Sequence, residues 1–334
     1  MPAELPKFWM VTNRNKENRG FGIIHSPLTY WTSSGGPLDS LSSWSEVKHD
    51  AFARLLKKAA DSFPLILDLE RHEEQRHVAF FIHGYSTTWK EAVTTYSTVC
   101  KELFDGPNSL GVCVLFNWPT DGLVTNYLPD RMDARLSAPD LASVLSELYV
   151  HLVERQKAGA ADPKKSCRAK VSLLAHSMGN FVVQKAAEQL WTRHNQPLLV
   201  SLINQLAMVA ADVDNDLFKG GETLDKSEGD ALANLTYRIS ALYSGRDRVL
   251  GLSAGLKHFG KRRLGRAGLD QRSGISDNVW DLDCSKLFDP QDFSVHNSYF
   301  RPDKGKRIYE VLRLILQGVD RNLIIRHARQ IEFP

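Results

Sequence analysis

The sequence has few cysteines, and none of them stands in an arrangement typical of a metal site or a disulfide framework. Its four cysteines are scattered over 334 residues, and no two form a Cys-x-x-Cys pair. Close pairs are the usual mark of zinc and redox sites, and small secreted domains that depend on disulfides carry many more cysteines for their length. We therefore expect isolated thiols, no metal and no cofactor.

Long apolar runs and a strong charge imbalance are missing as well. No run approaches the roughly 18 apolar residues of a transmembrane helix, and the N-terminus lacks the basic and apolar regions of a secretory signal. The net charge of +3 is too small to favour nucleic acid or an anionic membrane as a partner. No phosphate-binding glycine motif is present. We expect a cytoplasmic protein with a small-molecule substrate, no nucleic-acid partner and no stable membrane insertion, and we leave its oligomeric state open.

Short buried strands alternate with amphipathic helices from His77 onward. The expected strands are apolar runs at residues 77–82, 112–116, 171–175, 203–213, 237–243 and 279–282. Apolar residues that recur three and four positions apart predict helices at residues 89–104, 141–152, 178–190, 222–234 and 308–315, with a last one ending near residue 329. This alternation is typical of an α/β protein with a mostly parallel sheet covered by helices on both faces.

The first 69 residues do not follow this alternation. Residues 8–12 predict a short strand that the polar run 13–19 ends, residues 20–45 predict irregular chain or short edge strands, and residues 50–60 predict a helix. We expect residues 1–69 to be an N-terminal extension whose edge strands pack on the sheet, and residues 70–334 to form one catalytic domain. The remaining polar stretches, 120–139 and 255–276, are expected to be loops.

A strand–turn–helix segment at Lys170-Val-Ser-Leu-Leu-Ala-His-Ser-Met-Gly-Asn180 dominates the chemistry of the sequence. Ala175 and Gly179 lie two positions on either side of Ser177, which matches a nucleophile elbow, Gly-x-Ser-x-Gly, with alanine in the first glycine position. The small flanking residues let the strand and the helix approach closely around a sharp turn. The alternative is a plain junction at which Ser177 only caps the helix.

A serine nucleophile needs a histidine base and a carboxylate that orients it. Asp247 follows the strand at residues 237–243, and His296 lies in a loop beyond the next strand, so the chain order is serine, acid, histidine. Asp212 and Asp214, after the preceding strand, are the competing acids. We prefer Asp247 because it lies one strand nearer the histidine.

Two N–H donors are needed for the oxyanion of an acyl-transfer intermediate. We expect the backbone N–H of Met178, directly after the nucleophile, to be one of them. The other is expected from Tyr85, because Gly84 lets the backbone of the loop after residues 77–82 approach a substrate. Trp118 and Tyr127 are candidates for lining an acyl pocket, with plain packing as the alternative.

Several motifs together resemble the α/β-hydrolase superfamily and, more narrowly, a bacterial family of α/β hydrolases of unknown function. They are Phe80-Phe-Ile-His-Gly-Tyr85, Phe116-Asn-Trp-Pro119, Leu174-Ala-His-Ser-Met-Gly-Asn180, Tyr243-Ser-Gly-Arg-Asp247 and His296-Asn-Ser-Tyr299. The resemblance covers residues 78–300 and implies the α/β-hydrolase fold, the triad Ser177–Asp247–His296 and an esterase-like activity. It implies no particular substrate.

Two basic stretches are open to a plainer interpretation. Arg14, Lys16 and Arg19 are expected to form a solvated turn, and residues 257–266 a solvated loop, with binding of an anionic substrate group as its alternative. The sequence therefore predicts a serine hydrolase that cleaves an ester or thioester. The alternatives are a catalytically silent binding protein of the same fold and an acyltransferase that uses the same triad.

Overall fold

The chain forms two compact units, Met1–Ser172 and Leu173–Pro334. The computed structural model describes residues 5–123, 126–194, 201–219, 229–257, 260–270 and 274–334. Strand β6 (Lys170–His176) runs across the boundary between the two units. The expected division into an extension of residues 1–69 and a catalytic domain of residues 70–334 stays a prediction.

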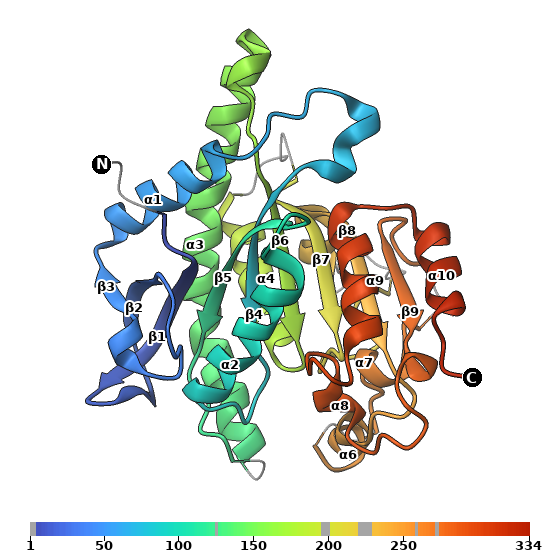
Figure 1. The fold of residues 1–334 in the computed structure, drawn as a ribbon. Helices are drawn as coiled ribbons and strands as arrows, with labels where there is room; N and C mark the ends of the chain where they lie inside the picture. Colours follow the sequence, from blue (N-terminus) through green and yellow to red (C-terminus); the bar gives the residue numbers. More distant parts are fainter. Residues whose placement is uncertain (1–4, 124–125, 195–200, 220–228, 258–259, 271–273) are drawn as a thin grey trace. The chain divides into compact units, whose positions relative to one another are not determined.

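Five strands of the first unit are hydrogen-bonded in the order β3-β2-β1-β5-β4 (Figure 1). They are β1 (Phe8–Glu17), β2 (Gly20–Ser33), β3 (Ser45–Val47), β4 (His77–Ile82) and β5 (Gly111–Asn117). Strand β1 pairs antiparallel with β2 and parallel with β5, and β5 pairs parallel with β4. The predicted strands at residues 77–82 and 112–116 are confirmed.

The N-terminal strands are longer than expected. Strand β1 continues through the polar run to Glu17, and β2 is a single strand of 14 residues instead of irregular chain. The two strands form a hairpin in which Arg14 lies opposite His25 and Lys16 opposite Phe21. Cross-strand hydrogen bonds therefore hold this polar stretch extended although its sequence lacks the alternation of apolar residues that marks a strand.

The helices of the first unit are α1 (His49–Asp61), α2 (Trp89–Val99) and α3 (Tyr127–Ala161). The first two confirm predicted helices, and α2 begins at a capping box formed by Thr88 and Glu91. The expected loop at residues 120–139 is wrong in its second half, because α3 begins at Tyr127 and includes Pro139. The early buried positions of α3 are occupied by Asp130, Ala134 and Ser137, so the apolar stripe that marks a helix is absent there.

The second unit contains strands in the order β6-β7-β8-β9. Strands β7 (Ile203–Val209), β8 (Thr236–Tyr243) and β9 (Val279–Asp283) pair in parallel and confirm the predicted strands, although β7 ends four residues early. The longer helices are α4 (Gly179–His194), α9 (Lys306–Gln317) and α10 (Arg321–Gln330), as expected. Of the helix predicted at residues 222–234, the structure shows α5 (Asp230–Leu235), and residues 222–228 lie outside the described part of the chain.

The stretch expected to be a loop at residues 255–276 contains helical structure. Helix α6 (Arg248–Lys257) extends into it, and a short helix α7 (Leu264–Ala267) follows. A Cβ atom on Gly265 would stand 2.1 Å from the carbonyl carbon of Ala210, so only glycine lets α7 pack this closely against the end of β7. Residues 258–259 and 271–273 of this stretch lie outside the described residues.

Both units thus have the predicted α/β character, with helices packed on the strands (Figure 1). Strand pairing is parallel from β1 through β5 to β4 and from β7 to β9, and antiparallel from β1 through β2 to β3. Strands β4 and β6 to β8 are almost entirely buried, which explains why they read in the sequence as continuous apolar runs. Among the described residues, no helix is long and apolar enough to span a bilayer.

Candidate active site

The turn between β6 and α4 holds Ser177 in a constrained backbone conformation. Its φ is 50°, in the left-handed region that costs a non-glycine residue about 1–2 kcal/mol. Backbone hydrogen bonds hold the turn: the Ser177 N–H donates to the carbonyl of Val209 at 3.0 Å, and the Ser177 carbonyl accepts from the N–H groups of Asn180 and Asp212, each at 3.1 Å. This is the geometry of the predicted nucleophile elbow.

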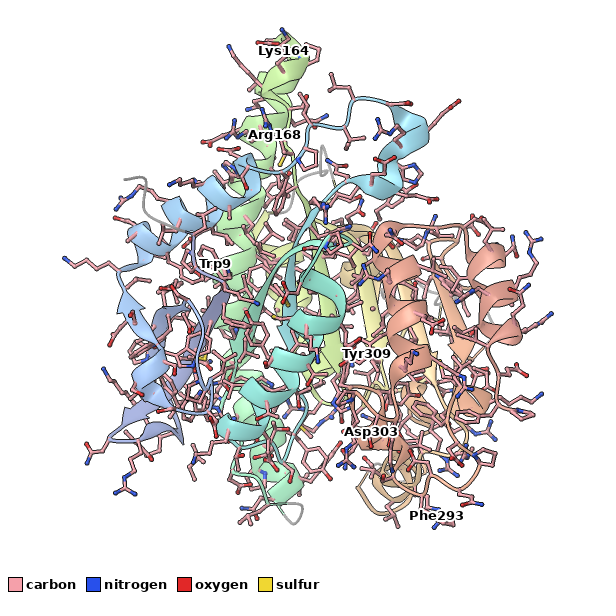
Figure 2. The ribbon with its side chains drawn as sticks, in the orientation of Figure 1. Trp9, Lys164, Arg168, Phe293, Asp303 and Tyr309 are labelled. Atoms are coloured by element: carbon pink, nitrogen blue, oxygen red, sulfur yellow. The ribbon has the colours of Figure 1, made fainter. Side chains whose placement is uncertain are left out.

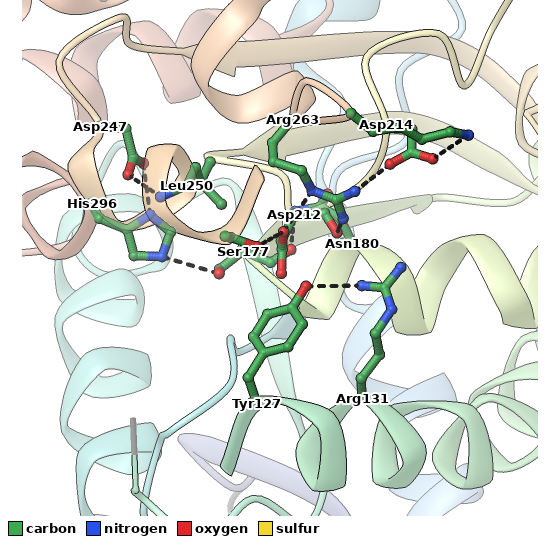
Figure 3. Close-up of polar contacts among 12 residues, drawn as sticks. Tyr127, Arg131, Ser177, Asn180, Asp212, Asp214, Asp247, Leu250, Arg263 and His296 are labelled. Atoms are coloured by element: carbon green, nitrogen blue, oxygen red, sulfur yellow. Dashed lines mark hydrogen bonds and ion pairs between the residues drawn. The ribbon is translucent and has the colours of Figure 1, made fainter. Parts of the chain in front are cut away.

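Three side chains of the second unit form a continuous hydrogen-bonded row (Figure 3). The Ser177 hydroxyl lies 3.0 Å from Nε2 of His296, and Nδ1 of His296 lies 2.7 Å from Oδ2 of Asp247. His296 comes from a short helix, α8 (Val295–Ser298), and Asp247 from the turn after β8. The structure therefore brings together the three residues that the sequence selects for the triad.

The second carboxylate oxygen of Asp247 is also engaged. Oδ1 accepts from the Leu250 N–H at 2.9 Å, at the start of α6, and the Asp247 carbonyl accepts from Arg266. Asp247 is fully buried. These bonds hold the carboxylate in one orientation, so that Oδ2 faces the imidazole.

The surroundings of His296 act on its charge in opposite directions. Burial disfavours the imidazolium, but the adjacent Asp247 carboxylate and, more weakly, Asp212 outweigh burial and raise the pKa of His296 above its ordinary value. In the neutral ring, Nδ1 carries the proton and donates to Asp247, since Asp247 is an acceptor. Nε2 is then free to accept the Ser177 proton.

The competing acids, Asp212 and Asp214, have a different partner. Oδ1 of Asp212 accepts from Nε of Arg263 at 2.8 Å and from the Ser253 hydroxyl at 3.3 Å, and Asp214 accepts from Nη1 of Arg263. Arg263 is almost completely buried. The expectation of a solvated loop at residues 257–266 is therefore wrong for Arg263, which forms a buried ion pair instead of facing solvent.

The predicted oxyanion donors lie in different units. The Met178 N–H directly follows Ser177, and no hydrogen-bond acceptor for it exists among the described residues. Gly84 and Tyr85 lie in the turn after β4 of the first unit, where the Tyr85 ring contacts the Tyr127 ring edge-on with centroids 5.4 Å apart. The oxyanion role of Tyr85 and the substrate-binding role of Gly84 stay predictions.

Trp118 and Tyr127, the candidate pocket residues, are both buried in the first unit. The Trp118 indole stacks on His83 with ring centroids 5.3 Å apart, and its Nε1 donates to the His83 carbonyl at 2.9 Å. Tyr127 begins α3, and its hydroxyl accepts from Arg131 at 3.3 Å. These contacts favour the packing interpretation for Trp118 and leave the role of Tyr127 a prediction.

Arg14 is the clearest residue that sequence reasoning misjudged. It is 1% exposed instead of solvated, and its guanidinium donates to four acceptors: Asn117 Oδ1 at 3.0 Å and the carbonyls of Gly22, Thr120 and Thr87 at 3.1, 2.9 and 2.8 Å. Burial lowers the pKa of Arg14 to about 9, although Asp130 and Asp133 oppose the shift. The side chain still carries its charge at neutral pH and ties the turn after β4 to the turn after β5.

Arg246, next to Asp247, is a second residue that the sequence did not single out. Its guanidinium donates to five backbone carbonyls of the segment that precedes His296, at distances of 2.7 to 3.2 Å. The acceptors are Ser285, Phe288, Asp289, Pro290 and Asp292. Only the position of Arg246 in the turn that also supplies Asp247 could have drawn attention to it.

His176, the residue before Ser177, also contacts the histidine of the row. Its Nε2 donates to the His296 carbonyl at 3.1 Å, and the two rings lie 5.1 Å apart. His176 thus restrains the backbone of α8 from the side of the elbow. Among the described residues, no cluster of three or more His, Cys, Asp or Glu side chains could hold a metal ion.

Similar proteins are found in both sequence and structure comparisons. A curated relative, the uncharacterized protein alr1448 of Nostoc sp. (strain PCC 7120 / SAG 25.82 / UTEX 2576), is 28% identical over 221 residues, 57% of this chain and 52% of its own. The chain thus spans about half the length of that relative. Among solved structures, an esterase of Pyrobaculum calidifontis is 11% identical with a TM-score of 0.34 and coverage of 73% of this chain and 76% of its own. Aspergillus fumigatus lipase B is 12% identical with a TM-score of 0.31, and the match covers 80% of this chain and 55% of the lipase chain.

A family model gives the most extensive sequence match. The model describes an alpha/beta hydrolase of unknown function (DUF900) and matches residues 59–277. This range is more than half of the chain, and it contains the elbow with Ser177 and the turn with Asp247. The chain therefore belongs to the family of α/β hydrolases of unknown function (DUF900).

Proposed function

We propose that the protein is a serine hydrolase that cleaves a carboxylic ester or thioester through an acyl-enzyme on Ser177. One observation carries this proposal: the hydrogen-bonded row from the Ser177 hydroxyl through His296 to Asp247, with Ser177 in a left-handed backbone conformation. A serine that only capped α4 would need neither an imidazole at hydrogen-bond distance nor a carboxylate behind it.

In the acylation step, the Ser177 oxygen attacks the carbonyl carbon of the substrate while Nε2 of His296 takes the hydroxyl proton. Asp247 keeps the imidazole in the tautomer that can accept this proton and stabilises the imidazolium that forms. The proton then passes from Nε2 to the departing alcohol or thiol. The bond from the carbonyl carbon to that group breaks, and the acyl group remains on Ser177.

The negative charge on the carbonyl oxygen needs preorganised donors. The Met178 N–H suits this role, because Met178 directly precedes α4 and its N–H has no acceptor among the described residues. The Tyr85 N–H remains the predicted second donor. Water, activated by His296, then attacks the acyl-enzyme and releases a carboxylic acid.

A fluorophosphonate probe tests the proposal, because it reacts with an activated serine and not with an ordinary one. We expect the wild-type protein to be labelled on Ser177, and Ser177→Ala to lose both labelling and nearly all ester turnover, since removing a triad member costs several orders of magnitude. Ser42→Ala, at an exposed serine of the first unit, is the matched control and should behave as wild type. Esterase activity above about a tenth of wild type in Ser177→Ala would remove Ser177 from the mechanism.

The same probe separates the proposal from its alternatives. A catalytically silent binding protein would not be labelled although it is folded. An acyltransferase would be labelled, but in the presence of an alcohol acceptor it would yield a new ester instead of a free acid, which product analysis detects. A panel of p-nitrophenyl esters of increasing chain length would define the acyl group that the site accepts.

A further inference from the structure

The first unit contains an apolar cavity that is lined by α1, α3 and the sheet and is partly open to solvent. Its volume is about 110 Å³, and its walls include Phe52 and Leu56 of α1, Val144 and Leu148 of α3, and Phe80 of β4. None of the lining residues is among the residues predicted for catalysis, the oxyanion or the acyl pocket. The cavity is therefore a feature separate from the proposed triad, and an inference about it does not depend on the proposed function.

Helix α3 presents an apolar stripe to this cavity. Leu141 and Leu145 are buried, but Val144, Leu148 and Leu152, which are spaced four residues apart and line the cavity, remain half-exposed. Large apolar side chains that face an unfilled space lose dispersion contacts. An apolar cavity of about 150 Å³ holds a benzene-sized molecule, which sets the scale for this site.

Among the described residues that line the cavity, the acidic side chains have ion-pair partners and two cations do not. The two lining acids are paired, since Glu147 lies 2.7 Å from Nε2 of His49 and Asp61 lies 2.6 Å from Arg155. The lining cations Lys57 and Arg168 have no carboxylate partner among the described residues.

Arg168 stands beside the C-terminal end of α1 (Figure 2). Its Nη1 donates to the carbonyls of Asp61 and Phe63 at 3.2 and 3.4 Å. Those two bonds leave its Nε and Nη2 without an acceptor in the described part of the chain. A planar guanidinium held in this way has donors available for a carboxylate.

The pKa of His151, a half-buried residue of the cavity wall, indicates which charges dominate near it. Burial lowers the pKa of His151, and the charges of Lys57 and Arg155 lower it further, more strongly than Asp61 and Glu154 raise it. At His151 the two cations thus outweigh the two acids.

We propose that this cavity binds a short-chain monocarboxylate, with the hydrocarbon chain between α1 and α3 and the carboxylate at Lys57 and Arg168. The apolar interior selects the chain, and the two unpaired cations select the acid over a neutral molecule of the same length. Scaled from the benzene-sized cavity, the volume suits a tail of about four to six carbons.

Isothermal titration of the full chain with butanoate, hexanoate and hexan-1-ol tests the proposal. Each buried methylene contributes about fourfold in affinity, so hexanoate should bind roughly 15-fold more tightly than butanoate. Hexan-1-ol, which lacks the charge, should bind about fivefold more weakly than hexanoate. Saturable binding that is equal for the acid and the alcohol would overturn the role of the cations.

Substitutions in the apolar wall and at the charged edge of the cavity test the two parts of the proposal separately. Leu148→Trp should fill the cavity and abolish hexanoate binding, and Ala53→Phe, from the opposite wall on α1, serves the same purpose if the first variant does not fold. Arg168→Gln removes one of the two cations, so it should weaken hexanoate about twofold and leave hexan-1-ol unchanged. Lys164→Gln, a nearby exposed lysine that does not line the cavity, is the matched control and should bind as wild type. Absence of saturable hexanoate binding to the wild type, or undiminished binding to a folded cavity-filled variant, would overturn the proposal.

Discussion

At the scale of single residues, the second unit presents two buried carboxylates that influence the same histidine. Asp247 is hydrogen-bonded to His296, whereas Asp212 is paired with Arg263 and acts on His296 only through its field. A carboxylate already neutralised by a buried guanidinium is a poor partner for an imidazolium, because the charges of the pair largely cancel. The contacts thus favour Asp247 as the orienting acid, the assignment that the order of strands also suggests.

We predict that Asp247→Asn reduces turnover by about 10³-fold or more, since an amide cannot hold the imidazole in the required tautomer. Asp212→Asn should cost far less in rate, although breaking its pair with Arg263 should lower stability by roughly 3–5 kcal/mol. Rates at saturating ester and thermal midpoints must be measured together, because an unfolded variant imitates an inactive one. A folded, inactive Asp212→Asn protein beside an active Asp247→Asn protein would reverse the assignment.

The raised pKa of His296 leads to a prediction about pH. The base must be neutral to accept the serine proton, so kcat/KM should fall as pH decreases through the pKa of His296 in the free protein. Because Asp247 raises that pKa above 6.5, the acidic limb of the wild-type profile should lie above pH 6.5. In Asp247→Asn the limb should move to lower pH, since burial still acts on the ring and the carboxylate does not. A limb below pH 6.5 in the wild type would contradict the electrostatic account.

At the scale of elements, the loop between β9 and α8 determines where His296 stands. This segment has little regular structure, and five of its carbonyls converge on the Arg246 guanidinium. Within the same loop, Oδ1 of Asp292 accepts from the Ser294 N–H at 2.9 Å and from Lys304 at 3.1 Å. The turn that carries Asp247 thus also holds the loop that leads to His296.

We predict that Arg246→Met lowers kcat by about 10- to 100-fold with a smaller change in KM, because a misplacement of about 1 Å costs up to 10² in rate. Arg246→Lys should recover part of the loss, since an ammonium can reach fewer of the carbonyls. Arg248→Met is the control, because Arg248 is exposed and its guanidinium lies over the Phe293 ring, 5.1 Å from the centroid. Equal kinetics for Arg246→Met and Arg248→Met would show that Arg246 does not position the base.

At the scale of the whole molecule, Arg14 is an unusual contributor to stability. A fully buried cation with no carboxylate at hydrogen-bond distance in the described structure is stabilised instead by carbonyl and amide oxygens. Those oxygens belong to β2, to the turn after β4, and to the end of β5 and the turn that follows it. Removing the guanidinium would take a donor from each of them, although the Thr87 carbonyl would keep the Thr120 hydroxyl at 2.7 Å and Asn117 Oδ1 would keep its contact with Nε2 of His83 at 3.2 Å.

We predict that Arg14→Met lowers the free energy of unfolding by roughly 3–5 kcal/mol, the usual cost of leaving a buried polar network without its charged member. Arg14→Lys should have an intermediate effect because the ammonium keeps the charge but not the fork of donors. Urea unfolding, with Lys16→Met as an exposed control on the same strand, measures both. A loss below about 1 kcal/mol in Arg14→Met would mean that water replaces the guanidinium at little cost.

Much of the second unit could be predicted from the sequence because its signals are local. The buried strands appear as short apolar runs, α4 and α9 as periodic stripes, and the elbow as small residues around Ser177. Each signal spans about ten residues and depends on the turn chemistry or periodicity of that segment alone. The first half of α3 and the extension of β1 beyond Thr12 lack such signals, because their buried faces are polar or small.

By itself, the sequence determined the α/β class, the elbow and the chain order of serine, acid and histidine. Only the tertiary structure decided which charged side chains are buried and what they contact, because those partners lie far away along the chain. Arg14 meets Thr120 across 106 residues, Arg263 meets Asp212 across 51, and Arg246 meets Asp292 across 46. The cavity between α1 and α3 has the same origin, since a space that packing leaves unfilled has no counterpart in the pattern of any single segment.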